Sequence, residues 1–183
     1  DHPEQTTGVV LNHTYGPRYQ LMLIGAGQVS LYLADMAQKL DYQVIVCDPR
    51  QEMLDQWHVD GVRLTNEMPD DAVRQFSQDN FSAIIALTHD PRIDDMGLME
   101  ALKTRAFFVG AMGSTRTSAK RRERLLQLDL TETEINRLHA PVGLPIGSKT
   151  PAEIAIAILA QLTALRGEQT PSLEADFRTQ HVA

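Results

Sequence analysis

Four runs of consecutive apolar residues divide the chain, and each predicts a strand that is buried on both faces of a sheet. The runs cover residues 20–24, 43–47, 82–87 and 106–109. Between them, apolar residues recur with the spacing of an α-helix. This pattern predicts helices at 28–40, 69–76, 91–102 and 114–128, and a last helix that begins near residue 151 and ends near 166.

Weaker patterns indicate a short helix at 51–57, a short strand at 62–64 and a helix behind the capping sequence Thr131-Glu132-Thr133-Glu134. Strands that alternate with helices form a parallel sheet, because each crossover helix packs on a face of the sheet. The predicted fold class is therefore α/β, a Rossmann-like parallel sheet with helices on both faces in three αβα layers. We expect this domain at 19–166, after an N-terminal extension or edge strand (1–18) and before a flexible tail (167–183).

Composition narrows the class of protein. Apolar residues make up 43% of the chain and charged residues 22%, which is ordinary for a globular domain. The net charge of −7 argues against a nucleic-acid partner, which needs a dominant basic surface. Cys47 is the one cysteine, so we expect a reducing compartment, the cytoplasm. No apolar run reaches the roughly 20 residues of a membrane span, and the start at Asp1 suggests an excised domain.

The segment Gly25-Ala26-Gly27-Gln28-Val29 connects the first predicted strand to the first predicted helix. It matches the G-x-G-x-x-G turn, except that Ser30 replaces the third glycine. In that turn the glycines let a pyrophosphate approach the backbone, and the helix N-terminus attracts its negative charge. We expect residues 25–29 to bind a phosphorylated cofactor. The alternative is a tight turn without a ligand.

Polar side chains follow the strands predicted at 43–47 and 82–87. Binding sites on parallel sheets form at the carboxyl ends of the strands. Asp48 could accept hydrogen bonds from ribose hydroxyls or cap the following helix, and Arg50 could contact an added phosphate or be a solvated arginine. Thr88, His89 and Asp90 form a second polar cluster, in which the histidine could donate a proton, bind a metal or form a loop hydrogen bond. One His with one Asp is not metal-ligand spacing. We assign no catalytic and no metal-binding residue.

A second anion site is expected between the strand predicted at 106–109 and the basic helix predicted at 114–128. Its candidate residues are Gly110, Ala111, Gly113 and Ser114. Arg116, in the first turn of that helix, could contact a phosphate through two hydrogen bonds. The remaining basic residues, from Lys120 to Arg124, are predicted to form a solvated face or a partner surface.

The loop before the last helix contains Gly143, Gly147 and Lys149. With the capping sequence that begins at Thr150, it would bring a third set of backbone donors to the same rim. An ordinary loop before a capped helix is the alternative. Cys47 lies inside an apolar strand and is expected to be an inert core thiol rather than a nucleophile.

Five segments, taken in order, resemble one family. They are 23–29, 46–50, 88–90, 108–117, and 141–147 leading into 150–155. Together they resemble the carboxy-terminal domain of the XdhC/CoxI family of accessory proteins for molybdenum hydroxylases, over residues 20–165. Two positions depart from the family pattern: Gln28 stands where the family often has His, and Pro145 where it often has an acid. The family's amino-terminal domain, with its cysteine-containing motif, is not found in this sequence.

The resemblance implies a cofactor-binding chaperone rather than an enzyme. Such proteins bind the molybdenum cofactor (molybdopterin or its dinucleotide form), support its sulfuration by a cysteine desulfurase, and insert it into a xanthine dehydrogenase or aldehyde oxidoreductase-like apoenzyme. From the residues alone, Gly25, Gly27 and Asp48 also fit an NAD(P)-dependent oxidoreductase or an NAD(P)-binding sensor. Against an oxidoreductase, we find no acid/base pair for hydride transfer. A protein-binding module that uses the basic helix, and a homodimer, stay open.

Overall fold

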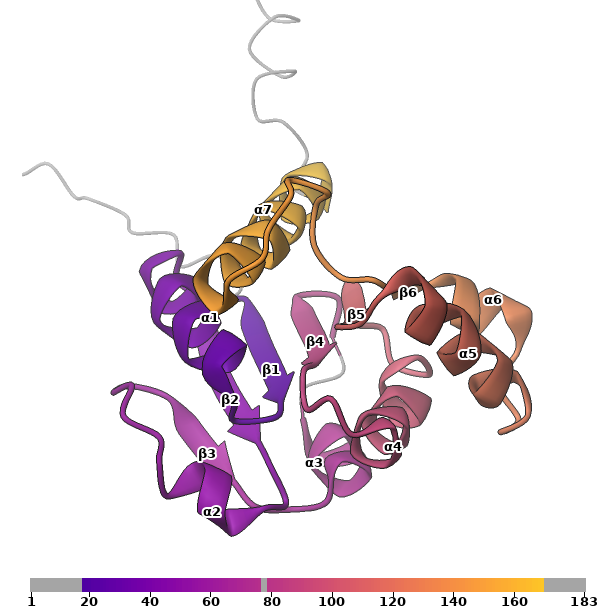
Figure 1. The fold of residues 1–183 in the computed structure, drawn as a ribbon, viewed down its shortest axis with the longest axis horizontal. Helices are drawn as coiled ribbons and strands as arrows, with labels where there is room; N and C mark the ends of the chain where they lie inside the picture. Colours follow the sequence, from indigo (N-terminus) through magenta and orange to yellow (C-terminus); the bar gives the residue numbers. More distant parts are fainter. Residues whose placement is uncertain (1–17, 77–78, 170–183) are drawn as a thin grey trace, which may run out of the picture.

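The computed structural model describes residues 18–76 and 79–169. Six strands form one parallel sheet in the order β3-β2-β1-β4-β5-β6 (Figure 1). The strands are β1 (Gln20–Ile24), β2 (Gln43–Cys47), β3 (Arg63–Thr65), β4 (Ser82–Ala86), β5 (Phe108–Ala111) and β6 (Leu138–His139). This is the strand order of dinucleotide-binding sheets, in which the chain changes direction across the sheet between β1 and β4. The predicted α/β class with a Rossmann-like parallel sheet is confirmed.

Helices cover both faces of this sheet. On one face, α1 (Gln28–Lys39) and α7 (Pro151–Gln169) lie side by side (Figure 1), and the short α2 (Gln51–Leu54) packs with them through Leu54. The helices of the other face are α3 (Pro69–Gln75), α4 (Pro91–Ala101), α5 (Thr115–Leu126) and α6 (Glu132–Asn136).

The alternation of side chains along β1 divides the core into two clusters. Leu21 and Leu23 pack with residues of α1 and α7, whereas Met22 and Ile24 pack with residues of α3 and α4. All four are at most 2% exposed, and each such side chain contributes about 1.5–3 kcal/mol by burial. Because both faces are covered, the strand has no polar alternation. That is why a continuous apolar run marked it in the sequence.

Several predicted boundaries differ from those of the structure. β5 runs from Phe108 to Ala111, two residues later than expected, and α2 ends at Leu54. The two-residue strand β6 was not predicted. α7 continues to Gln169, so residues 167–169 are helical rather than part of a tail. Residues 1–17 of the expected N-terminal extension or edge strand, and residues 170–183 of the expected tail, lie outside the described residues.

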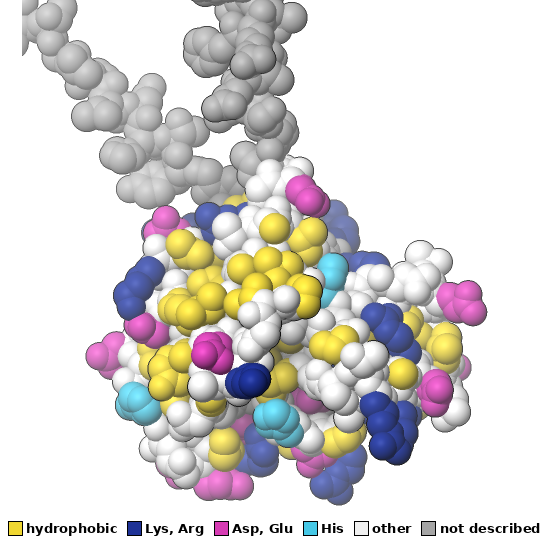
Figure 2. Space-filling view, turned by 45° about the horizontal axis from the view of Figure 1, so that its top comes forward, with side chains coloured by type: hydrophobic (Ala, Val, Ile, Leu, Met, Phe, Trp, Pro, Cys, Tyr) yellow, Lys and Arg dark blue, Asp and Glu magenta, His cyan; other side chains and the backbone are white. Residues whose placement is uncertain are grey.

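Residues 154–160 of α7 are all apolar, and only one side of this stretch is buried. Ala155 and Ile158 are buried in the core, whereas Ile156 is 49% exposed. The preceding loop adds Leu144 and Ile146, and Leu144 N donates to Ala157 O of α7 at 3.0 Å. Figure 2 shows hydrophobic side chains gathered over α7 and α1. Exposed apolar areas of this kind are typical of protein contact surfaces.

Candidate functional site

Gly25 brings the end of β1 against the loop that follows β4. Its φ of +110° lies in the range that favours glycine. A Cβ at this position would lie 2.9 Å from Thr88 Cγ2 and 3.0 Å from Thr88 N. The fold itself therefore requires this glycine. The contact lies where strand order reverses, which is where ligands bind in sheets of this kind.

Gly27 has no such structural requirement. Its φ of −86° suits any residue, and a Cβ there would meet no protein atom within 4 Å. Gly27 is also the N-cap of α1, and no side chain caps that helix. The buried Ser30 closes the turn from below, because its Oγ donates to Gly25 O at 2.6 Å. The turn thus leaves room for an anion beside a helix N-terminus, where backbone N–H groups and the helix dipole favour negative charge.

Asp48 lies beneath the turn rather than on its surface. The side chain is fully buried, accepts a hydrogen bond from Ala26 N at 2.9 Å, and is held by the guanidinium of Arg50. Burial alone would raise the pKa of Asp48, but the hydrogen bonds from Arg50 and Ala26 outweigh it and hold the pKa below its usual value. Asp48 does not cap α2, whose N-cap is Arg50. Both carboxylate oxygens are engaged, and of the pair only the half-buried Arg50 lines the glycine-turn cavity described below.

The cluster after β4 separates into three roles. Thr88 is held by Asp94 of α4, since its Oγ1 donates to Asp94 Oδ1 at 2.6 Å and its N donates to the same oxygen at 3.1 Å. Asp90 caps α4 by accepting from Arg92 N at 2.9 Å. His89 is exposed and has a φ of +66°, which turns the chain between these two anchors. Of the three residues, His89 is free to contact a ligand.

The candidate residues within β5 line no cavity, whereas residues that follow the strand do. Gly110 is buried, and a Cβ there would lie 2.7 Å from Val142 Cγ2, so this glycine serves packing. Ala111 is also buried in the strand. Ser114 caps α5 by accepting from Thr117 N at 3.1 Å. Arg116 is exposed and lines neither of the cavities described below.

Arg121 is the main residue that the sequence interpretation missed. It is 4% exposed and donates to Asp95 Oδ1 at 3.0 Å, to Asp94 Oδ2 at 3.2 Å and to Met112 O at 3.1 Å. Arg124 donates to the second oxygen of Asp95 at 2.7 Å. Burial raises the pKa of Asp94. The available signal was the Asp94-Asp95 pair, which lies on the helix that packs against the basic one.

The prediction of a solvated basic face is therefore wrong for most of α5. Arg121 is buried, Arg124 pairs with Asp95, and Arg122 donates to Ile135 O and Leu138 O at 2.9 and 2.7 Å. These contacts bind α5 to α4 and α6. Of the basic residues from 120 to 124, Lys120 alone is exposed.

Two adjoining cavities occupy the carboxyl edge of the sheet. The glycine-turn cavity, of about 350 Å³, is lined by Gly27, Gln28, Val29, Arg50, Met53, Leu87, Thr88, His89, Met112, Lys149, Pro151 and Ile154. The α5 cavity, of about 600 Å³, is lined by His89, Pro91, Met112, Gly113, Ser114, Thr117, Lys120, Arg121, Arg124 and Ile154. They share His89, Met112 and Ile154, so together they form one hollow of the size that binds small molecules and cofactors.

The lining of this hollow is positively charged. Arg50 and Lys149 line the glycine-turn cavity, and Lys120, Arg121 and Arg124 line the α5 cavity, with no Asp or Glu among the lining residues. The chain as a whole carries a net charge of −7. A basic hollow on an acidic chain, beside a helix N-terminus, favours an anionic ligand.

The loop before α7 contributes one side chain to the hollow, Lys149. Gly143 packs against α7, and neither it nor the exposed Gly147 lines a cavity. The amides of Lys149 and Thr150 donate to Glu153 Oε2 at 2.7 and 2.9 Å. The capping box is confirmed. The same bonds occupy the backbone donors that the loop was expected to offer to a ligand.

The structure thus divides the predicted site residues into three groups. In the cavity lining it brings together Gly27, Gln28, Val29, Arg50, Thr88, His89, Gly113 and Ser114. Supporting positions beneath the turn are taken by Gly25, Ala26 and Asp48. Outside both cavities lie Asp90, Gly110, Ala111, Arg116, Gly143 and Gly147.

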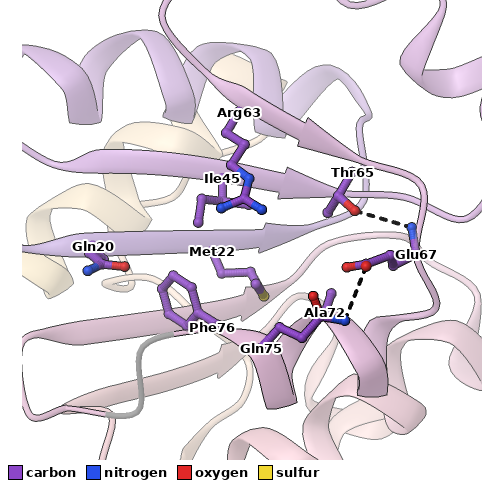
Figure 3. Close-up of a pocket in the computed structure, with 9 residues that line it drawn as sticks. All are labelled: Gln20, Met22, Ile45, Arg63, Thr65, Glu67, Ala72, Gln75 and Phe76. Carbon is purple, nitrogen blue, oxygen red and sulfur yellow. Dashed lines mark hydrogen bonds between the residues drawn. The ribbon is translucent and has the colours of Figure 1, made fainter.

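A smaller cavity, of about 100 Å³, lies away from these residues, between α3 and the strands β1 to β3 (Figure 3). Its floor includes Met22 and Ile45, and Arg63 extends over it from β3. At one end, Glu67 N donates to Thr65 Oγ1 at 3.3 Å. No residue of the predicted site lines this cavity.

Other chemistry finds little support in the part of the chain that the structure describes. Residues 18–76 and 79–169 contain no group of three His, Cys, Asp or Glu side chains placed to hold a metal ion. Cys47 is buried, its Sγ donates to Glu67 O at 3.3 Å, and burial raises its pKa to about 12. This thiol is not a nucleophile at neutral pH. Among the described helices, none is long and apolar enough to span a bilayer.

The chain is similar in sequence to several known proteins. The chain is 31% identical to an uncharacterized protein, YqeB, of Escherichia coli K12 over 83% of this chain and 28% of that one. It is 27% identical to a probable xanthine dehydrogenase subunit of Bacillus subtilis 168, over 90% of this chain and 48% of the relative. A 31% match to PaoD of E. coli K12, a molybdenum cofactor insertion chaperone, covers 50% of this chain and 29% of PaoD.

Solved structures agree with these relatives. The crystal structure of a xanthine dehydrogenase from Bacillus halodurans matches with a TM-score of 0.73 at 28% identity, over 87% of this chain and 46% of that chain. The chain thus spans less than half the length of these relatives. The family profile of the XdhC Rossmann domain matches residues 21–162. Because this match covers most of the sequence, the chain belongs to the XdhC family and contains its Rossmann domain.

Proposed function

We propose that this domain binds the molybdenum cofactor, as molybdopterin or its dinucleotide form, and takes part in maturation of a molybdenum hydroxylase. The family assignment supports an accessory role, and one relative is named a molybdenum cofactor insertion chaperone. A second relative is named as part of a probable xanthine dehydrogenase. The recipient in this proposal is a xanthine dehydrogenase or aldehyde oxidoreductase-like apoenzyme.

The observation that carries the proposal is the open space at Gly27. Neither its φ nor any protein atom within 4 Å requires glycine there, so the position is free for a ligand that approaches the backbone. That space opens into a hollow with basic side chains and no carboxylate in its lining. A phosphorylated pterin fits this donor set, because its phosphate needs cations and amides.

In this proposal, different residues of the hollow contact different parts of the ligand. The N-terminus of α1, Arg50 and Lys149 bind the phosphate. Met112 and Ile154, which both cavities share, give the fused ring an apolar contact and exclude water from it. His89 lies between the two cavities and donates a hydrogen bond to the ligand. When bound, the cofactor supplies the molybdenum centre on which sulfuration takes place.

Sulfur itself must come from outside the described residues. Cys47 is buried and its thiol is protonated at neutral pH. We therefore propose a cysteine desulfurase as the sulfur donor and assign this domain the role of presenting the cofactor to it. The domain is a carrier in this scheme rather than an enzyme.

Gly27→Ala tests the proposal. The methyl group meets no protein atom, so the variant should fold like the wild type while its methyl fills the space for the phosphate. Overpacking of this kind costs about 1–3 kcal/mol, which is roughly a tenfold to hundredfold loss of affinity for molybdopterin in an anaerobic fluorescence titration. Gly167→Ala is the matched control, since a Cβ there also meets no atom within 4 Å and lies near the far end of α7.

Absence of molybdopterin and dinucleotide binding by the wild type, alone and within the longer protein, would refute the proposal. Equal binding by the wild type and Gly27→Ala would show that the ligand lies elsewhere.

An NAD(P)-binding domain is the second candidate, because the strand order β3-β2-β1-β4-β5-β6 is that of dinucleotide-binding sheets. In such domains a carboxylate after the second strand binds the ribose hydroxyls. Here Asp48 occupies that position, but both of its oxygens already accept hydrogen bonds. Thermal stabilisation by NADH or NADPH, without a response to molybdopterin, would favour this candidate over the first.

A further inference from the structure

The α5 cavity has a wall of its own that the glycine turn does not reach. One face of α5 supplies Ser114, Thr117, Lys120, Arg121 and Arg124 to its lining. These are two hydroxyls and three cations: Ser114 is the N-cap of α5, and the other four residues lie along the helix as far as Arg124 in its last turn. No residue from 25 to 29 lines this cavity. The α5 wall is therefore a separate surface on which a second group of a ligand can bind.

The charges on this wall are only partly neutralised within the protein. Asp94 and Asp95 pair with Arg121 and Arg124. No salt bridge is found for Lys120 among the described residues, and both carboxylates lie behind the wall, outside the cavity lining. The wall thus presents surplus positive charge to the cavity while the carboxylates fix the direction of the arginines.

Ser118 adds a second, independent indication of a ligand. Its side chain is 2% exposed, and its Oγ has no hydrogen-bond partner among the described residues. It lies one turn after Ser114 and one turn before Arg121, both of which line the cavity. The Cβ of a residue at Gly113 would lie 3.7 Å from this oxygen, which places the hydroxyl directly behind the cavity wall. Ser118 is not itself among the residues that line the cavity. A buried hydroxyl without a partner is costly, and its hydrogen is available to an oxyanion that binds against Gly113.

We infer that the α5 cavity is a second oxyanion subsite, separate from the glycine turn, and that the ligand carries an anionic group at each of the two places. The identity of that ligand rests on the proposed function, whereas the subsite itself does not. Two parts of the cofactor have the required chemistry: the oxo ligands of its molybdenum centre and the second phosphate of its dinucleotide form.

Inorganic phosphate, titrated at constant ionic strength and followed by amide NMR, tests the subsite without the cofactor. Amides 113–117 report on the α5 cavity and amides 27–30 on the glycine turn. We expect both sets to shift, with separate midpoints. The double variant Lys120→Gln/Arg124→Gln should raise the Kd at 113–117 by roughly tenfold and change the Kd at 27–30 by less than about twofold.

The matched control is Lys103→Gln/Arg105→Gln, which removes one lysine and one arginine from the exposed loop between α4 and β5, at the other edge of the sheet. It should leave both midpoints unchanged. An equal weakening by this control would mean that net charge alone attracts phosphate, and no response of 113–117 would overturn the subsite directly.

Ser118→Ala provides a variant that separates binding from folding. Removing an unpaired buried hydroxyl should leave the Tm of the ligand-free protein equal or higher, while it weakens phosphate binding at 113–117 severalfold. Weaker binding together with a lower Tm would indicate a structural role for the hydroxyl and count against the subsite.

Binding of three forms of the cofactor then shows which of its groups occupies the second subsite. They are metal-free molybdopterin, molybdenum-loaded molybdopterin and the metal-free dinucleotide. Sensitivity to Lys120→Gln/Arg124→Gln in the loaded form assigns the subsite to the molybdenum oxo group, and sensitivity in the dinucleotide assigns it to the second phosphate. Binding of all three forms without any effect of the double variant would overturn the inference. Phosphate binding at 113–117 without binding of any pterin would instead overturn the proposed function.

Discussion

Arg50 closes over Asp48 with two parallel hydrogen bonds, from Nε to Oδ1 at 2.9 Å and from Nη2 to Oδ2 at 2.8 Å. Asp48 also fixes the glycine turn through Ala26 N. We predict that Asp48→Asn lowers the free energy of unfolding by about 1–3 kcal/mol at neutral pH, because the amide loses these charge-assisted bonds. Urea unfolding of both proteins measures the difference.

The same pair should give a defined pH dependence. The hydrogen bonds to Asp48 hold its folded pKa below its usual value, although burial opposes them. Such a group adds stability that is present above its unfolded pKa and lost as the pH falls through its folded pKa. The gap between the wild type and Asp48→Asn should therefore shrink below about pH 4. A gap that stays constant to the point of acid unfolding would contradict the assigned charge.

Gly25 and Gly27 should respond to the same substitution in opposite ways. Gly25→Ala forces a side chain into a φ of +110° and against the backbone of Thr88. We expect it to destabilise the domain by about 2–4 kcal/mol. Gly27→Ala should change stability by less than about 0.5 kcal/mol. Thermal melts of both variants check this contrast, and equal destabilisation would mean that Gly27 also serves the fold.

Arg121→Met should be among the most damaging single changes on α5. It leaves the buried carboxylates of Asp94 and Asp95 without their shared partner, which typically costs about 3–5 kcal/mol. The exposed Arg116 on the same helix is the matched control, and Arg116→Met should stay within about 0.5 kcal/mol. In the double variant Asp94→Asn/Arg121→Met, part of the loss should be recovered, because one unpaired charge is gone. Additive losses would show that the three side chains do not act as a network.

His139 should make stability depend on pH in the neutral range. Its ring stacks on Phe108, with 4.6 Å between centroids, and burial together with the nearby Arg122 lowers its pKa. The folded protein therefore resists protonation more than the unfolded chain does, so stability should fall as the pH drops below about 6.5. Denaturant unfolding at pH 7.5, 6.5 and 5.5 should show this loss for the wild type but a smaller one for His139→Phe. The exposed His58 and His89 are present in both proteins and cancel.

The sheet and the glycine turn were predictable because their signals are local. Each of these signals depends on residues that are neighbours in sequence. They are the buried runs at 20–24 and 43–47, the G-x-G turn and both capping boxes. β6 was missed because two residues between a helix and a loop carry no periodicity.

The α5 wall was misjudged for a different reason. A run of arginines resembles a solvated face, and only the packing of α4 against α5 shows that Asp94 and Asp95 draw Arg121 inward. In the same way, Asp48 has the expected position, but its engagement by Arg50 depends on the loop geometry after β2. The sequence pointed to the edge of the sheet where the two cavities lie. Which side chains reach the hollow depended on contacts between segments far apart in the chain.

The bonds from Asp94 to Thr88 and to Arg121, and from Arg121 to Met112, run along the back of both cavities. In the folded protein these bonds tie the loops after β4 and β5 to α4 and α5. A molecule that enters loses its own freedom of motion but restricts little of the protein's. Binding to such a preformed site should show one kinetic phase. Its observed rate constant should rise linearly with ligand concentration, without a later step of loop closure.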